Sequence, residues 1–331
     1  MDRDDLDRWI STGDLDELLR EVDRCVDRGD WTGLERLRDR SRSAIERGHQ
    51  LWPAASFAEY RLALEAPGPV AAAAVVEGAG WFAPGPLTEV LAQGHDWDEL
   101  SAHLMPGPAR DLVAQERVLR GEDLTGRWDG ELPPRLLAWE PGYELAEYRP
   151  DGEARIPAPE LPAATTPLPG GAPPAGCPDG LDGARALTDA VRHWADHSDG
   201  RVRAVSVEGT AADAVRAVTA LGENDRGAAP TTVSIGVADA AALLGWAAAS
   251  GGAHGRRRGA ATGRWEAWWA LAVLTGLDDH WPVDPGPAAE ELRWFRWAAG
   301  PETGWVCRLA VEDPDDGLAW ALDATDRTSE K

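Results

Sequence analysis

The distribution of proline is the feature that most restricts how this chain can fold, because proline fixes φ, lacks an N–H donor and interrupts helices and central strands. Residues 127–180 contain 12 of the 25 prolines. This density excludes long helices and favours extended or polyproline geometry. We therefore predict three zones: residues 1–126, a connector at 127–180 that runs over the surface, and residues 181–331. Within the connector, YELAEYRP is a candidate edge strand.

Residues 1–126 show the spacing of amphipathic helices. In LDELLREVDRCV, apolar side chains recur at i, i+3, i+4, i+7 and i+11, and WTGLERLRDRSRSAI repeats this pattern. Pro-Gly-Pro then occurs at 67, 84 and 106, and again at 285, each time before a helix-forming run. Proline is tolerated at the first helical position, so each occurrence predicts a turn followed by a helix start.

The spacing of these starts suggests a helical array. The first three lie 17 and 22 residues apart, which makes 39 residues for a pair of helices. This sum is near the period of HEAT-type pairs of about 40 residues. Because the register is irregular, a plain antiparallel array is favoured and HEAT-like pairs are the alternative.

The period changes after residue 181. Three β-rich runs, RVRAVSVEG, PTTVSIGVA and GWVCRLAVED, are each followed by a sequence with helix-start chemistry. Thr210 and Asp213 have the spacing of a capping box, Asp239 can cap a second helix, and Asp313-Pro314 resembles a third start. We expect an α-rich, mixed α/β protein whose C-terminal part has about three strands in parallel pairing. A continuation of the helical array is the alternative.

Charge and composition exclude several classes of function. The formal charge is -24, so the long-range field repels phosphate backbones and argues against nucleic-acid binding. The only lysine is Lys331. A Walker A loop, a pyridoxal-phosphate enzyme and a protein kinase each need a lysine at their site, so none of these is expected and no cofactor is predicted.

The cellular location follows from what the sequence does not contain. No run of 18 apolar residues occurs, and MDRDDLDRWIST is acidic where a signal peptide is basic and then apolar. We expect a cytoplasmic protein that does not enter a membrane. Three widely spaced cysteines, Cys25, Cys177 and Cys307, favour reduced side chains used for packing.

The segment SGGAHGRRRGAATGRW, from residue 250, concentrates positive charge in an acidic chain. It lies between DAAALLGWAAAS and RWEAWWALAVLTGL, two runs apolar enough to be buried helices, so its arginines are expected near a core. Arginine keeps its charge and must then be paired. The favoured partners are internal carboxylates; an anionic small molecule or an acidic segment of a partner protein are the alternatives. The candidate catalytic residue is His254, and the candidate ligand-binding residues are Arg256, Arg257, Arg258, Arg264, Glu59 and Arg61. In the favoured interpretation, the internal partners of the arginines 256–258 include Glu59, Glu208, Asp239 and Glu312.

Other signals are weaker. His193, Asp196 and His197 have the i, i+3, i+4 spacing of metal ligands on a helix, but a solvated helix end is favoured and no metal is predicted. Eight of the 17 tryptophans lie between 246 and 305, where they fill a core of small residues or line a pocket for an aromatic or sugar-like ligand. The sequence contains no nucleophile elbow and no cysteine beside an evident base.

Two blocks, LWPAASFAEYRLALEAP from 51 and SGGAHGRRRGAATGRWEAWWALAVLTGL from 250, carry a resemblance. The chain resembles a family of functionally uncharacterised, full-length proteins of GC-rich actinobacteria. This resemblance implies no activity, fold or ligand. It implies only that Glu59, Arg61, His254 and the arginines 256–258 belong to blocks worth testing.

The leading hypothesis is a cytoplasmic interaction or binding protein that engages an anionic small molecule or an acidic segment through the arginine-rich loop. Helical arrays present extended surfaces and seldom carry catalytic groups. One alternative is an enzyme for a small anionic substrate, with His254 as acid or base and the arginines as a clamp. Another is an acidic, immunity-like or antitoxin-like protein that attracts a basic partner by electrostatic steering.

Overall fold

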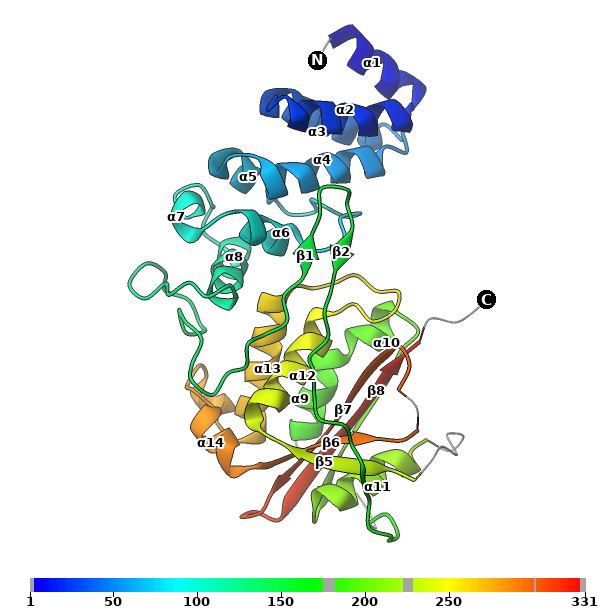
Figure 1. The fold of residues 1–331 in the computed structure, drawn as a ribbon, viewed down its shortest axis with the longest axis vertical. Coiled ribbons are helices and arrows are strands. Elements are labelled where there is room, and N and C mark those ends of the chain that lie inside the picture. Colours follow the sequence, from blue (N-terminus) through cyan, green and yellow to red (C-terminus); the bar gives the residue numbers. More distant parts are fainter. Residues whose placement is uncertain (1–2, 175–181, 223–228, 301, 328–331) are drawn as a thin grey trace. The chain divides into compact units, whose positions relative to one another are not determined.

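The chain forms two compact units in a computed structural model that describes residues 3–174, 182–222, 229–300 and 302–327 (Figure 1). The N-terminal unit comprises Met1–Leu136 and Leu145–Pro157, and the C-terminal unit comprises Leu137–Glu144 and Ala158–Lys331. The proline-rich stretch is therefore divided between them. The predicted class, an α-rich mixed α/β protein, is confirmed.

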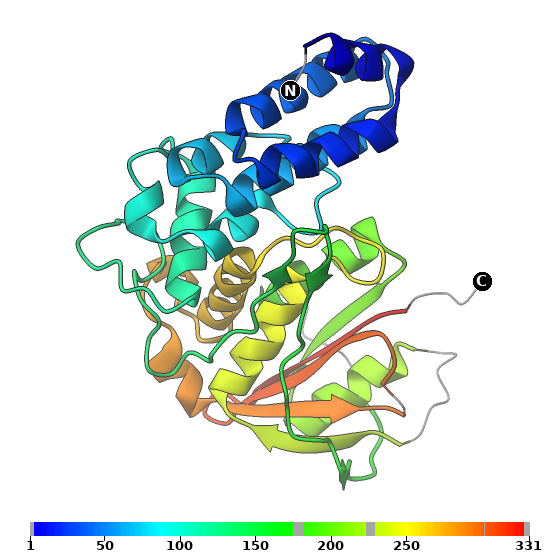
Figure 2. The same ribbon diagram turned by 45° about the horizontal axis from the view of Figure 1, so that its top comes forward.

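The N-terminal unit is an array of helices in which successive elements pack on one another (Figure 2). One continuous apolar core runs through it and takes in Tyr148 from a small β-hairpin. The predicted edge strand in YELAEYRP is the first strand of this hairpin. The elements are α1 (Arg3–Thr12), α2 (Leu15–Asp27), α3 (Trp31–Glu46), α4 (Trp52–Glu65), α5 (Gly68–Ala74), α6 (Leu87–Gly94), α7 (Trp97–Leu100), α8 (Pro108–Leu119), β1 (Glu147–Tyr148) and β2 (Ala154–Arg155).

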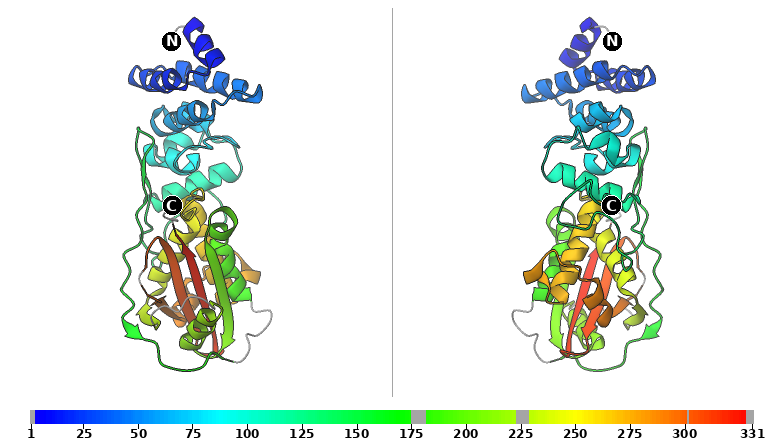
Figure 3. Two further views of the ribbon diagram at one scale, coloured as in Figure 1. Left: turned by 90° about the vertical axis from the view of Figure 1, so that its right-hand side faces the viewer. Right: turned by 90° about the vertical axis from the view of Figure 1, so that its left-hand side faces the viewer.

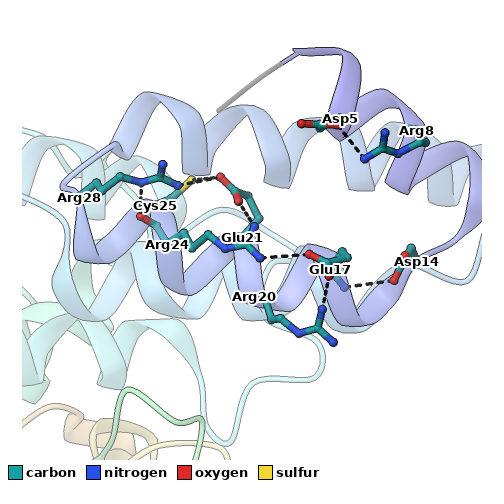
Figure 4. A network of polar contacts seen from close by, with 9 residues as sticks. All are labelled: Asp5, Arg8, Asp14, Glu17, Arg20, Glu21, Arg24, Cys25 and Arg28. Carbon is teal, nitrogen blue, oxygen red and sulfur yellow. Dashed lines mark hydrogen bonds and ion pairs between the residues drawn. The ribbon is translucent and has the colours of Figure 1, made fainter.

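Helix α2 shows how local sequence determines this part of the fold. Leu18, Val22 and Cys25 are fully buried on one face, while Asp14 caps the helix by accepting a hydrogen bond from the backbone N–H of Glu17. Ion pairs extend along the helix, joining the half-buried Glu17 and the buried Glu21 to arginines one or two turns further on (Figure 4). Such pairs form along one helix because helical neighbours lie three and four residues apart.

The Pro-Gly-Pro prediction is confirmed at all four positions. Helices α5 and α8 and a C-terminal helix, α14 (Gly286–Glu291), carry a proline in their first turn, and α6 follows directly after Pro86. The missing N–H of proline costs little here because the first backbone donors of a helix have no intrahelical acceptor.

The C-terminal unit is built on a sheet with the strand order β3-β5-β6-β7-β8-β4. Every pairing in it is antiparallel. Its remaining elements are β3 (Thr166–Pro167), α9 (Asp182–Val191), α10 (His193–His197), β4 (Arg201–Glu208), α11 (Ala211–Ala220), β5 (Thr231–Ile235), α12 (Val237–Ala249), α13 (Ala260–Leu274), the 3-10 turn η1 (Asp278–His280), β6 (Arg293–Ala298), β7 (Trp305–Asp313) and β8 (Leu318–Asp326).

The two faces of this sheet carry different cores, because successive side chains of a strand point to opposite sides. On β8, Trp320, Leu322 and Ala324 face the core formed with α9, α12 and α13. Ala319 and Ala321 face a smaller core formed with α11. Figure 3 shows helices lying against the strands of this unit. Strands β4, β6, β7 and β8 are thus covered by apolar cores on both faces, which explains their apolar sequences.

The number and direction of the strands differ from the prediction. Within the described residues the sheet has six strands rather than about three, and they pair antiparallel rather than parallel. The first two β-rich runs are followed by helices, as predicted. Helix α11 begins with the predicted Thr210–Asp213 capping box, and Asp239 lies in the first turn of α12. The third leads into a strand. Asp313 accepts the N–H groups of Asp315 and Asp316, and Gly317 at φ 65° completes the turn of a hairpin. An Asx side chain closes such a turn with the same bonds as it uses to cap a helix.

The two helices predicted to be buried around the arginine-rich segment are α12 and α13, and both are largely buried. They approach each other closely at Gly245 and Gly263, where a Cβ on Gly263 would lie 2.1 Å from the carbonyl oxygen of Gly245. Small residues permit this approach, and the indole of Trp268 fills the neighbouring core with 0% exposure.

Truncation of the α2 stripe is expected to destabilise the N-terminal unit. Leu18→Ala removes a fully buried side chain and should lower the free energy of unfolding by about 2–5 kcal/mol, measured by urea denaturation. Met105→Ala, at a side chain 81% exposed in the same unit, should change it by less than about 0.5 kcal/mol. Equal losses for the two variants would contradict this description of the core.

Candidate functional site

The arginine-rich segment is a loop of residues 250–259 between α12 and α13, as the sequence predicts. Its backbone folds back on itself, so that a Cβ on Gly251 would lie 2.2 Å from the carbonyl oxygen of Gly255. Gly252 and Gly259 adopt φ of 73° and 100°, which side-chain-bearing residues rarely do. The glycines are therefore required by the path of the loop, independently of any ligand.

Backbone groups fix this loop to the C-terminal unit. The N–H of Ala253 donates to Oδ2 of Asp326 at 2.6 Å, that of His254 to Oγ of Ser198 at 2.9 Å, and that of Arg258 to the carbonyl of Ala249 at 2.7 Å. The imidazole of His254 itself is exposed. The loop is thus anchored on both sides of the arginine run.

The three adjacent arginines differ in their surroundings. Arg256 is exposed and Arg257 is 7% exposed. Arg258 donates to Oε1 of Glu266 at 2.6 Å and lies 3.3 Å from Nδ1 of His193. The expectation that a guanidinium near the core meets an internal carboxylate therefore holds at Arg258, with Glu266 as its partner.

The carboxylates named in advance as internal partners are engaged elsewhere. Glu59 accepts hydrogen bonds from Arg42 and from the backbone of Gly80, within the N-terminal unit. Glu312 accepts from Arg293 and from the N–H of Ala211. Asp239 accepts from the N–H of Gly236, and Glu208 is exposed. The prediction of these residues as partners is wrong for Arg258, whose carboxylate partner is Glu266. Glu59, Glu312 and Asp239 accept hydrogen bonds from donors of their own regions.

Arg264 takes part in a fully buried ion pair. Its Nε and Nη2 donate to the two oxygens of Glu140 at 2.7 and 2.6 Å, and both side chains are 0% exposed. Trp268 Nε1 donates to the same carboxylate at 2.9 Å, and the hydroxyl Oη of Tyr143 donates to it at 3.2 Å. Burial and the charge of Glu140 raise the pKa of Tyr143 well above its ordinary value. Arg264 thus serves to hold residues 137–144 in the C-terminal unit.

The predicted metal candidates lie together on α10 but point to different surroundings. His193 is buried, with Nε2 against the carbonyl of Ser250 and Nδ1 facing Arg258. Burial, followed by the charge of Arg258, lowers the pKa of His193 to about 4. Asp196 and His197 are exposed. Among the described residues, no three His, Cys, Asp or Glu side chains are grouped closely enough to hold a metal ion.

A cavity beside Arg257 is small. Tyr143, Trp246, Arg257 and Ala260 contribute to its lining, and its volume is about 10 Å³. A cavity of this size has room for about one water molecule. It therefore offers no site for a metabolite.

A larger hollow lies in the N-terminal unit, at the block LWPAASFAEYRLALEAP. This α4 groove has a volume of about 290 Å³. Its surface is mostly apolar, and one carboxylate lies on it, that of Asp151 in the turn between β1 and β2. The residues that line it are Leu19, Pro53, Phe57, Tyr60, Phe82, Ala83, Pro84, Asp151 and Gly152.

Hydrogen bonds fix the walls of the α4 groove. Ser56 Oγ accepts the N–H of Phe82 at 3.3 Å, and Glu59 accepts that of Gly80, so the loop that carries Phe82 is tied to α4. The hydroxyl of Tyr60 donates to the carbonyl of Arg149 at 2.6 Å, which ties the hairpin to the same helix. Glu59, a predicted ligand residue, is thus a buried support of the groove.

The segment that supplies most of the lining of the α4 groove is acidic in sequence. Residues 51–109 contain seven acidic side chains and a single arginine, Arg61. The other predicted ligand residue of this block, Arg61, is 5% exposed and pairs with Asp23 and Glu65. Burial, and next the charge of Asp151, raise the pKa of Tyr60 to about 12.

The chain belongs to a family of unknown function, DUF6183, whose model matches residues 16–328. Neither the curated proteins nor the solved structures contain a match. In the described part of the chain, no helix combines the length and the apolar character that crossing a membrane requires. Membership of the family therefore covers both units and brings no activity with it.

Sequence reasoning identified the α4 block but not the residues that line its groove. Phe57 and Phe82 come from separate segments, and Asp151 comes from the proline-rich zone. Two signals could have found them: the aromatic pair inside GAGWFAPGP, and the turn sequence RPDGE. Both sequences are short and rich in turn-forming residues, and turns of this kind present their side chains to solvent.

The buried ion pair generates a prediction about stability. Glu140→Gln leaves the charge of Arg264 uncompensated and should lower the free energy of unfolding by about 3–5 kcal/mol. The double variant Arg264→Met/Glu140→Met should lose less than the single variants Arg264→Met and Glu140→Met together, because it leaves no buried charge. Arg127→Met, from the exposed pair with Asp98, should cost no more than about 1 kcal/mol. Additive losses at Arg264 and Glu140 in chemical denaturation would refute the coupling.

The lowered pKa of His193 predicts a pH dependence. Between its ordinary pKa of 6.5 and its folded value of about 4, the unfolded chain binds the proton that the folded chain excludes. Stability therefore falls as pH decreases through this window, with a slope approaching one proton per molecule. His193→Gln should show a shallower slope between pH 6.5 and 4.5 in urea unfolding than the wild type. Identical slopes for His193→Gln and the wild type would exclude this effect.

Proposed function

We propose that this protein binds a partner protein and that the α4 groove receives a basic segment of that partner. The observation that carries the proposal is a mostly apolar groove of about 290 Å³ in a strongly acidic stretch of the chain. This hypothesis develops the acidic, immunity-like or antitoxin-like alternative from the sequence.

The dimensions and lining of the α4 groove support this use. Binding pockets typically begin at about 300 Å³ and combine apolar and aromatic walls with a few polar groups. Phe57 and Phe82 supply aromatic surface, and Phe82 is 58% exposed. Aromatic anchors in pockets dominate the energy of protein interfaces.

Electrostatics supports a basic partner. The formal charge of -24 attracts a cationic protein over long distances and accelerates its association at low salt. Asp151 places one negative charge at the groove itself. Long-range attraction brings a basic partner near, and the groove contacts determine which segment remains bound.

The arginine-rich segment has no role in this proposal. Arg258 and Arg264 have internal carboxylates as partners, and the cavity beside Arg257 has room for about one water molecule. His254 is exposed, so the enzyme hypothesis lacks the enclosed acid or base that it requires. The proposed setting is the cytoplasm of an actinobacterium, and the near absence of lysine supports a GC-rich source of this kind.

Peptide binding tests the proposal. Three sets of 12-residue peptides, which are basic, neutral and acidic, are compared for binding to the protein by fluorescence anisotropy at 0.15 M salt. Basic peptides should bind, and Phe57→Ala together with Asp151→Asn should weaken them at least about tenfold, since these residues supply the aromatic wall and the charge. Asp129→Asn, which removes one exposed charge from the same unit outside the groove lining, is the matched control and should change binding less than about twofold.

Two results would overturn the proposal. One is the absence of binding by any basic peptide. The other is equal weakening by the groove variants and by Asp129→Asn, which would show non-specific attraction to an acidic protein. Circular dichroism of each variant verifies that the helices remain folded.

A further inference from the structure

We infer that the side chain received by the α4 groove is arginine, with its methylene stem along the apolar wall and its guanidinium at Asp151. This inference rests on the proposed function and names the chemical group that the groove selects. It follows from the separation of apolar and charged surface within the groove and from the aromatic lining.

The apolar part of the lining fits a long cationic side chain. Leu19, Pro53 and Phe57 form apolar surface from α2 and α4, whereas Asp151 comes from the turn of the β1–β2 hairpin. Arginine and lysine bury their methylene stems on apolar surface while keeping the charged head at a polar group. A purely aliphatic side chain would leave the carboxylate of Asp151 without a counterpart in the interface.

The aromatic rings favour a guanidinium over an ammonium group. The guanidinium of Arg61, in the same unit, already lies over the ring of Phe57, with its Cζ 5.5 Å from the ring centroid. Tyr60 lies nearly parallel to Phe57, with an interplanar angle of 18° and centroids 6.3 Å apart. A planar, weakly hydrated guanidinium stacks on such rings, whereas an ammonium is compact and strongly hydrated.

The hairpin holds Asp151 in place to accept the head group. Oδ1 of Asp151 accepts the N–H of Glu153 at 2.9 Å, and the N–H of Gly152 donates to the carbonyl of Arg149 at 3.0 Å. Gly152 adopts φ 84°, and a Cβ there would lie 3.5 Å from Cε2 of Phe57. Glycine therefore permits the positive φ of the turn, and the turn that carries Asp151 lies beside the ring of Phe57.

The experiment uses peptides of the basic set that bind, resynthesised with arginine, lysine or neutral citrulline at each basic position in turn. At one position, the arginine peptide should bind at least about fivefold more tightly than the lysine peptide at 0.15 M salt, and citrulline should weaken binding further. Citrulline preserves the planar shape and removes the charge, so it separates stacking from ion pairing.

Two variants connect this preference to the groove. Phe57→Leu keeps an apolar wall and removes the ring, so it should reduce the preference for arginine over lysine to less than about twofold. Asp151→Asn should weaken arginine and lysine peptides alike and leave citrulline peptides unchanged. Asp129→Asn should alter none of these ratios, and each variant is used only after its circular dichroism matches that of the wild type.

The outcomes separate the two proposals. Equal binding of arginine and lysine peptides at every position, or an arginine preference that survives Phe57→Leu, would overturn the inference while leaving a basic-segment groove in place. Failure of every basic peptide to bind would overturn the proposed function and the inference together.

Discussion

The pairing of interior arginines with carboxylates is the constraint on which both units depend. A guanidinium keeps its charge at all ordinary pH values, so a buried one is tolerated only beside an acceptor. Arg264 and Glu140 satisfy this condition with both side chains fully buried. Without that pair, residues 137–144 would lose the polar contact that holds them against α13, and the aromatic groups of Tyr143 and Trp268 would lose a shared acceptor.

The same constraint shapes the α4 groove. Glu59 is 2% exposed, and it binds Arg42 on one side and the backbone of Gly80 on the other. This carboxylate thereby positions the loop that carries Phe82. Glu59, a candidate ligand residue from the sequence, is therefore not part of the groove lining and instead supports the loop that contributes Phe82 to it.

The helices could largely be predicted from the sequence, while the sheet and the groove could not. Pro-Gly-Pro marked helix starts, and the spacing in LDELLREVDRCV marked the face of α2 that is buried. The sequence after GWVCRLAVED was misinterpreted, because Asp313 can close a turn or cap a helix with the same hydrogen bonds. The pairing of β7 with β8 decides between them, and pairing depends on residues outside the local window.

By itself, the sequence determined the α-rich class, the helix starts, the acidic charge and the loop between two buried helices. Each of these depends on interactions within a few residues or on composition. Only the tertiary structure decided the strand order, the partner of each interior arginine and the residues that line the α4 groove. Glu140 and Arg264 are 124 residues apart, and Phe57 and Asp151 come from separate segments of the chain. Contacts at such separations are set by how whole elements pack, which no local pattern of residues encodes.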